Sequence, residues 1–153
     1  MLDLIGIRRA LHRIPELAFE ETKTSDFLAG VIGDLVRGRD DVEVTRFRTG
    51  IIVHVSGTGP GNTESGETIG WRADVDGLPI AEATSLPFAS EHDGVMHACG
   101  HDIHMTCGLG ILERVLRQRG RRGFVFLFQP AEENLSGAQE VVDNGLLDRY
   151  GIS

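Results

Sequence analysis

The chain has 153 residues, of which 41% are hydrophobic and 25% charged, a composition that excludes a disordered or fibrous protein and suits one compact domain. Its formal net charge of −8 at pH 7 offers no basic surface for nucleic acid and would be repelled by anionic membranes, so we expect neither partner. Charges interrupt the N-terminal residues where a signal peptide would be apolar, and no run reaches the roughly 18 apolar residues of a membrane span. The two cysteines are too few for a disulfide framework, and we therefore expect a cytoplasmic protein.

Two helices and a hairpin are expected first. Apolar residues at spacings of three and four predict a helix over residues 2–14, which Pro15 ends. A second apolar stripe predicts a helix over residues 21–36. The spacing of apolar residues then changes. The β-branched residues Val42 and Val44, and those at 51–53, predict two strands joined by a turn.

The rest of the chain is expected to alternate strands with helices. Residues 57–67 are nearly all turn formers and predict an exposed loop before a strand over residues 68–72. Residues 74–97 show little periodicity, and an irregular segment of that kind inside a compact domain is usually functional. Beyond it the pattern predicts a helix, a buried strand and a helix over residues 103–117, 124–128 and 137–144. This alternation indicates an α/β fold with three layers.

The densest polar cluster is Met96-His-Ala-Cys-Gly-His-Asp-Ile-His104, which holds one cysteine and three histidines. Thiolate and imidazole are preferred ligands of zinc and related ions, so Cys99 and His101 are candidate metal ligands. Gly100 would let the backbone bend between them. Taken singly, each of these residues is more often an ordinary core or surface residue, but the grouping favours a metal site.

The second candidate is Gln129-Pro-Ala-Glu-Glu133, directly after the buried strand, where open α/β sheets present their ligands. Adjacent residues of an extended chain point in opposite directions, so one glutamate can bind a metal while its neighbour faces the water that the metal activates. Such a carboxylate can accept the proton of that water and pass it to a leaving amine. The alternative is a pair of exposed acids at a helix N-terminus, where negative charge is favoured.

The third candidate is Arg72-Ala-Asp-Val-Asp76, after the strand over residues 68–72. Asp74 and Asp76, spaced i and i+2, can project together toward the site and orient a histidine ligand. The alternative is a turn capped by the aspartate side chains, which fits the glycine and proline that follow.

Read in this order, the motifs resemble those of the M20 metallopeptidase clan. The segments that carry the resemblance are HRIPEL at His12–Leu17, RADVDGLPI at Arg72–Ile80, MHACGHDIH at Met96–His104 and FQPAEE at Phe128–Glu133. They are most similar to the amidohydrolase branch, which deacylates N-acyl amino acids, hippurate, auxin conjugates and N-acetyldiaminopimelate. The resemblance runs through essentially the whole chain and implies a three-layer α/β/α metallohydrolase catalytic domain with a mixed sheet.

The resemblance also implies a two-metal centre that holds Zn or Mn. Cys99, His101 and Glu133 match its metal ligands. Glu132 matches the general base, and Asp74 matches the supporting acidic residue. The implied activity is hydrolysis of the amide bond of an N-acyl amino acid or a related small amide, through a metal-activated water and a glutamate base.

Two of these assignments stay open. Either Glu132 or Glu133 can be the general base, with the other as the metal ligand. Either Asp74 or Asp76 can be the supporting acidic residue. Three further residues of the cysteine and histidine motif are expected to support the ligands or the fold: His97, Asp102 and His104.

Family members are typically much longer than this chain. Residues 1–153 are therefore expected to be the N-terminal part of the catalytic domain, without the inserted smaller domain used for dimerisation or as a lid, and without the C-terminal return segment. Two further histidine ligands are expected from that portion, and the segment Glu133–Gly137 departs from the glycine-rich continuation usual in the family. We expect the chain alone to be weakly active or inactive, and to form a homo-oligomer. The alternative is a non-catalytic fragment that binds metal or a partner chain.

Overall fold

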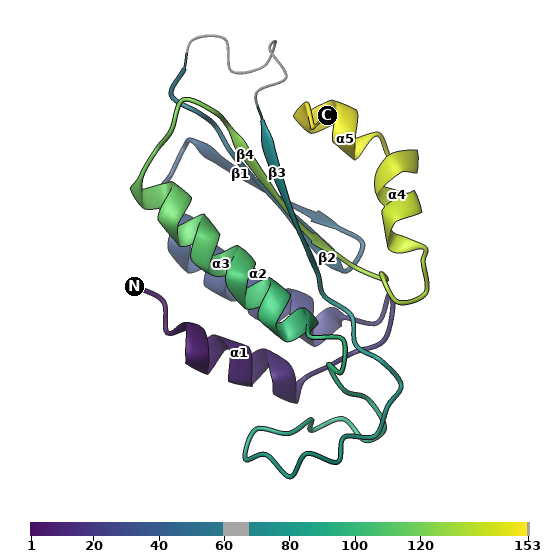
Figure 1. The fold of residues 1–153 in the computed structure, drawn as a ribbon. Helices are drawn as coiled ribbons and strands as arrows, with labels where there is room; N and C mark the ends of the chain where they lie inside the picture. The colour runs from purple at the N-terminus through teal and green to yellow at the C-terminus, as the bar shows by residue number, and fades with distance from the viewer. Residues whose placement is uncertain (60–67, 153) are drawn as a thin grey trace.

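The computed structural model describes residues 1–59 and 68–152, which fold into a four-stranded sheet with helices on both faces (Figure 1). The elements, in chain order, are α1 (Leu4–Arg13), α2 (Thr22–Val36), β1 (Val42–Phe47), β2 (Gly50–Val55), β3 (Ile69–Asp74), α3 (His101–Arg117), β4 (Phe124–Gln129), α4 (Gly137–Asp143) and α5 (Leu146–Tyr150).

The sheet is mixed and has the strand order β1-β2-β4-β3. β1 and β2 form an antiparallel hairpin, and β2 pairs antiparallel with β4. β3 runs parallel to β4, with Asp74 beside Gln129 at the end of the ladder. Because β3 and β4 are parallel, the segments that follow them leave the sheet at the same edge, where open α/β sheets present their sites.

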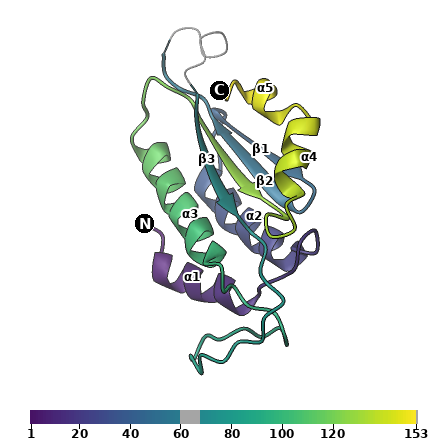
Figure 2. The same cartoon turned by 45° about the vertical axis from the view of Figure 1, so that its right-hand side comes forward.

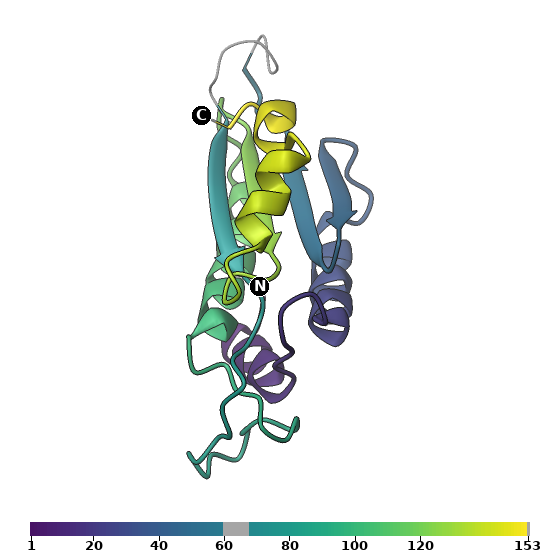
Figure 3. The ribbon, with the colours of Figure 1, turned by 90° about the vertical axis from the view of Figure 1, so that its right-hand side faces the viewer.

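Helices cover both faces of the sheet, as the edge-on view in Figure 3 shows. α2 and α3 pack on one face, and α1 packs against α3. α4 and α5 lie on the other face (Figure 2). Side chains alternate along β4: Phe126 and Phe128 are fully buried in the core with α3, whereas Val125 packs with Val141 and Tyr150 of the C-terminal helices.

The three-layer α/β/α arrangement expected from the sequence is confirmed. The predicted helices, hairpin and buried strand are present, with ends shifted by a few residues. The sequence pattern does not predict α5, which is separated from α4 by Gly145 at φ 62°. Most of the loop expected over residues 57–67 lies outside the described residues.

Residues 75–100 contain no helix or strand beyond an isolated bridge between Leu78 and Met96, as their lack of periodicity predicts. This segment projects below the sheet in Figure 1 and returns to the carboxyl ends of β3 and β4. It therefore delivers Cys99 and the start of α3 to that edge. Within the described ranges, no helix is long and apolar enough to cross a membrane.

Candidate metal centre

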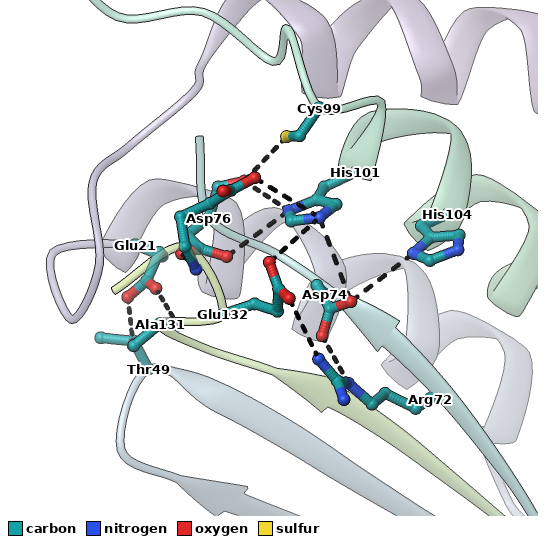
Figure 4. Close-up of polar contacts among 11 residues, drawn as sticks. Glu21, Thr49, Arg72, Asp74, Asp76, Cys99, His101, His104, Ala131 and Glu132 are labelled. Carbon is teal, nitrogen blue, oxygen red and sulfur yellow. Dashed lines mark hydrogen bonds and ion pairs between the residues drawn. The ribbon is translucent and has the colours of Figure 1, made fainter. Parts of the chain in front are cut away.

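Three chain segments that are distant in sequence meet at the carboxyl edge of β3 and β4 (Figure 4). They are the aspartate motif at the end of β3, the glutamate motif after β4 and the N-terminus of α3. One ligand atom each of Cys99, His101 and Glu133 lies within 4.8 Å of the other two. Thiolate, imidazole and carboxylate are the donor types that zinc and related divalent ions prefer, so this set fits such an ion.

His101 is oriented by Asp76. It is the first residue of α3, and Gly100 before it takes a left-handed conformation at φ 89°. The Nδ1 atom of His101 lies 2.9 Å from the carbonyl oxygen of Asp76 and 3.5 Å from its carboxylate oxygen Oδ1. With its proton on Nδ1, His101 donates to Asp76 and turns the Nε2 lone pair outward, the arrangement that fixes a metal-ligating imidazole.

Asp76 also holds the glutamate motif. Its side chain is fully buried, and Oδ2 accepts a hydrogen bond of 2.9 Å from the backbone N–H of Glu133. Burial acts to raise the pKa of Asp76, but the hydrogen bonds from His101 and from the backbone of Glu133 outweigh it and lower that pKa. Asp76 is therefore an anion that ties two of the candidate ligands together.

The electrostatics of His101 favour positive charge at this point. Burial acts to lower the pKa of His101, but hydrogen bonds with the Asp76 carboxylate and with Cys99 outweigh it and raise the pKa to about 11. The negative charge that favours a proton on this imidazole would also attract a cation. A ligand histidine must be neutral, so a cation bound here would displace that proton.

Glu132 and Asp74 lie on the Nε2 side of His101. The distances from Nε2 are 3.9 Å to Oε2 of Glu132, 3.8 Å to Oε1 of Glu133 and 4.0 Å to Oδ2 of Asp74. Arg72 donates from Nε to Oδ1 of Asp74 at 2.7 Å, and its Nη2 lies 3.7 Å from Oε1 of Glu132. The two carboxylates thus share one guanidinium beside the candidate ligands.

Glu21, which the sequence motifs do not single out, stabilises the turn that carries the glutamates through a hydrogen bond to its backbone. Glu21 is fully buried, and its Oε1 accepts a 2.9 Å hydrogen bond from the backbone N–H of Ala131. Ala131 has a positive φ of 54°, which costs energy in a residue other than glycine. A carboxylate at the start of a helix is usually explained by helix electrostatics, so no local signal marks this role.

A glycine is also required beside this turn. The N–H of Gly137 donates to the carbonyl of Ala131 at 2.9 Å. A Cβ atom at position 137 would lie 1.8 Å from the carbonyl oxygen of Pro130. The close approach of the two backbone segments therefore requires a glycine at position 137.

The remaining polar residues of the cysteine and histidine motif lie outside the set formed by Cys99, His101 and Glu133. Asp102 is fully buried and lies 2.7 Å from Nδ1 of His12 and 2.8 Å from Nε of Arg8, so it links α3 to α1. His97 is buried, and burial lowers its pKa to about 4. His104 is half exposed, and its Nδ1 lies 3.7 Å from Oδ2 of Asp74.

Comparisons with known proteins identify the family of the chain. Residues 70–153 match the model of the family described as peptidase family M20/M25/M40. A curated relative from Streptococcus pneumoniae (strain Hungary19A-6), named N-acetyldiaminopimelate deacetylase, is 56% identical over 151 residues, which are 99% of this chain and 38% of the relative. The relative from strain CGSP14, with the same name, is 54% identical over 95% of this chain and 37% of its own length. The chain thus spans little more than a third of the curated relatives it matches.

Solved structures share the fold of this chain. A Bacillus subtilis protein described as a dinuclear metal-binding peptidase from the M20 family is 38% identical, with a TM-score of 0.85 over 98% of this chain and 40% of that one. The LapA aminopeptidase of Legionella pneumophila, at 15% identity and a TM-score of 0.65 over 98% of this chain and 39% of that one, shares the fold.

Proposed function

Because the chain belongs to peptidase family M20/M25/M40, we propose that it forms the metal-binding part of a hydrolase that cleaves the amide bond of an N-acyl amino acid. The observation that carries this proposal is the convergence of Cys99, His101 and Glu133 beside a second glutamate, Glu132. The name of the relatives narrows the substrate to an N-acetylated amino acid such as N-acetyldiaminopimelate.

Cys99, His101 and Glu133 would hold the cation, with Zn and Mn as the candidates. Their donor atoms, one soft and two borderline or hard, are supported as a set by the contacts of Asp76. When bound, a divalent cation would supply Lewis acidity toward the scissile carbonyl and the attacking water. A two-metal centre needs more donors than these three, so further ligands would come from elsewhere in the protein.

Glu132 is the proposed general base. It is one-third exposed and lies beside the candidate ligands, so water and substrate can reach its carboxylate. It would take a proton from the attacking water and then deliver it to the nitrogen of the leaving amine, which releases a carboxylate and a free amino group. Arg72 and Asp74 would hold Glu132 in place through the shared guanidinium.

Residues 1–153 would be the N-terminal part of the catalytic domain. The fraction of the relatives that the chain covers, 37% and 38%, leaves room in them for a smaller domain and a return segment. The alternative proposal, a non-catalytic chain that binds metal, predicts the same ligands without turnover.

Metal retention tests the ligand assignment. The chain is loaded with Zn²⁺ or Mn²⁺, dialysed and analysed for metal, beside the double variant Cys99→Ser, His101→Ala and the matched control Cys107→Ser, which removes the other free thiol. We expect the wild type and the control to retain metal and the double variant to lose it. Equal retention in the double variant would show that the proposed ligands are wrong.

A further inference from the structure

A second set of donors lies next to the first and contains no thiol. One ligand atom each of Asp74, His101 and His104 lies within 4.8 Å of the other two. Oδ2 of Asp74 is 3.7 Å from Nδ1 of His104 and 4.0 Å from Nε2 of His101. Donor atoms bound to one first-row ion at about 2.0 to 2.2 Å stand a little over 3 Å apart, so small side-chain rotations would bring these three onto a common cation.

The second set is arranged before any cation arrives. Asp74 is almost fully buried, and Arg72 occupies its Oδ1 atom at 2.7 Å, which leaves Oδ2 directed at the two histidines. His101 and His104 lie three residues apart on α3, and their rings are nearly parallel, with an angle of 6° and centroids 5.9 Å apart (Figure 4). His104 is 54% exposed, so an ion can reach this side from solvent.

The two sets cannot be the two halves of one dinuclear centre, because they share a single nitrogen. Nδ1 of His101 is engaged by the carbonyl of Asp76 at 2.9 Å. Only Nε2 remains for a metal, and its one lone pair binds one ion. A cation held by Asp74 and His104 therefore withdraws His101 from Cys99 and Glu133.

We propose that Asp74, His101 and His104 form a thiolate-free site for one divalent first-row cation, which competes with the Cys99, His101 and Glu133 set for the His101 imidazole. The set with Cys99 and Glu133, here called the thiolate set, supplies two anionic ligands. The set with Asp74 and His104, here called the Asp74 set, supplies one, and the positive Arg72 guanidinium lies beside it. Coulomb attraction therefore makes the Asp74 set the weaker of the two. It is occupied when the thiol of Cys99 is unavailable.

Cobalt binding distinguishes the two sites without any measurement of activity. The chain is titrated with CoCl₂ in equilibrium dialysis, and its absorption spectrum is recorded in parallel, because a thiolate ligand gives Co²⁺ an intense charge-transfer band that nitrogen and oxygen ligands lack. We expect the wild type to bind Co²⁺ with this band. The variant Cys99→Ser should lose the band and still bind one Co²⁺ per chain.

Removal of His104 then identifies the residual site. In the Cys99→Ser background, His104→Ala should weaken Co²⁺ binding by at least about 100-fold, because loss of a direct ligand costs no less than loss of a supporting contact. The matched control in the same background is His54→Ala, which removes an imidazole paired with Val125 at the other end of β4 and should leave binding unchanged. His104 is half exposed, so its replacement should not unfold the chain, and far-ultraviolet circular dichroism checks this.

Two results would overturn the second site. They are complete loss of Co²⁺ binding in Cys99→Ser, and undiminished binding in Cys99→Ser, His104→Ala. The first result leaves the thiolate set of the proposed function intact, whereas absence of the charge-transfer band in the wild type would refute that set alone. Failure of the second site and failure of the proposed function are therefore separable.

Discussion

The backbone carbonyl of Asp76 lies 2.9 Å from Nδ1 of His101, and the carboxylate of the same residue accepts the N–H of Glu133. One fully buried residue thus orients a proposed ligand from the α3 side and a proposed ligand from the β4 side.

Asp76→Ala is expected to lower the affinity for Zn²⁺ by about 10 to 100-fold, because residues that orient metal ligands typically contribute that much. Asp76→Asn keeps an oxygen that can accept from Glu133 and should lose less affinity. Competition with a chelator of known affinity measures both variants. Unchanged affinity in Asp76→Ala would show that the ligands hold their positions without it.

Glu21 accepts a hydrogen bond from the turn that carries the glutamates, so its loss should lower the stability of the fold. Glu21→Ala leaves the N–H of Ala131 buried without an acceptor, and we expect the free energy of unfolding to fall by about 1 to 3 kcal/mol. The neighbouring Glu20 is exposed, and Glu20→Ala should change that free energy by less than about 0.5 kcal/mol. Urea unfolding followed by circular dichroism compares the two variants. Equal effects would contradict the role given to Glu21.

Gly137→Ala should disturb the same turn by steric contact, because its new Cβ would lie 1.8 Å from the carbonyl oxygen of Pro130. We expect a loss of stability together with weaker metal retention, since the turn carries Glu133. Gly30 of α2 has no atom within 4 Å of an added Cβ, so Gly30→Ala should instead stabilise the chain by about 0.5 to 1 kcal/mol. Thermal unfolding with and without Zn²⁺ tests the pair. A neutral Gly137→Ala would contradict the close approach.

The sequence predicts the proposed ligands because their signals are local. Cys99 and His101 stand together in one short motif, and Glu133 follows a strand whose apolar character marks it as buried. Parallel strands carry the segments that follow them to one edge, so β3 and β4 bring their motifs together. The alternation of strands and helices likewise predicts the three layers.

The supporting contacts are not predictable in the same way, because they depend on how distant segments pack. Glu21 meets Ala131 across 110 positions of sequence. Asp74 and Asp76 are chemically identical and two positions apart, and only the path of the chain beyond β3 turns Asp76 toward Nδ1 of His101 and leaves Asp74 on the Nε2 side. α5 is not predicted because a helix of five residues is too short to show a helical spacing of apolar residues.

The most direct test of the proposed hydrolase is the kcat of Glu132→Gln on an N-acetyl amino acid, measured at saturating metal in a protein of the relatives' full length that contains this chain. The substitution keeps the size of the side chain and removes the base. We predict that kcat falls by about 10² to 10⁴ with metal content unchanged, while Glu133→Gln loses metal affinity and recovers part of its activity in excess metal. If Glu132→Gln loses metal and Glu133→Gln keeps it without activity, the two roles are exchanged. Full activity in both variants would contradict the proposed mechanism.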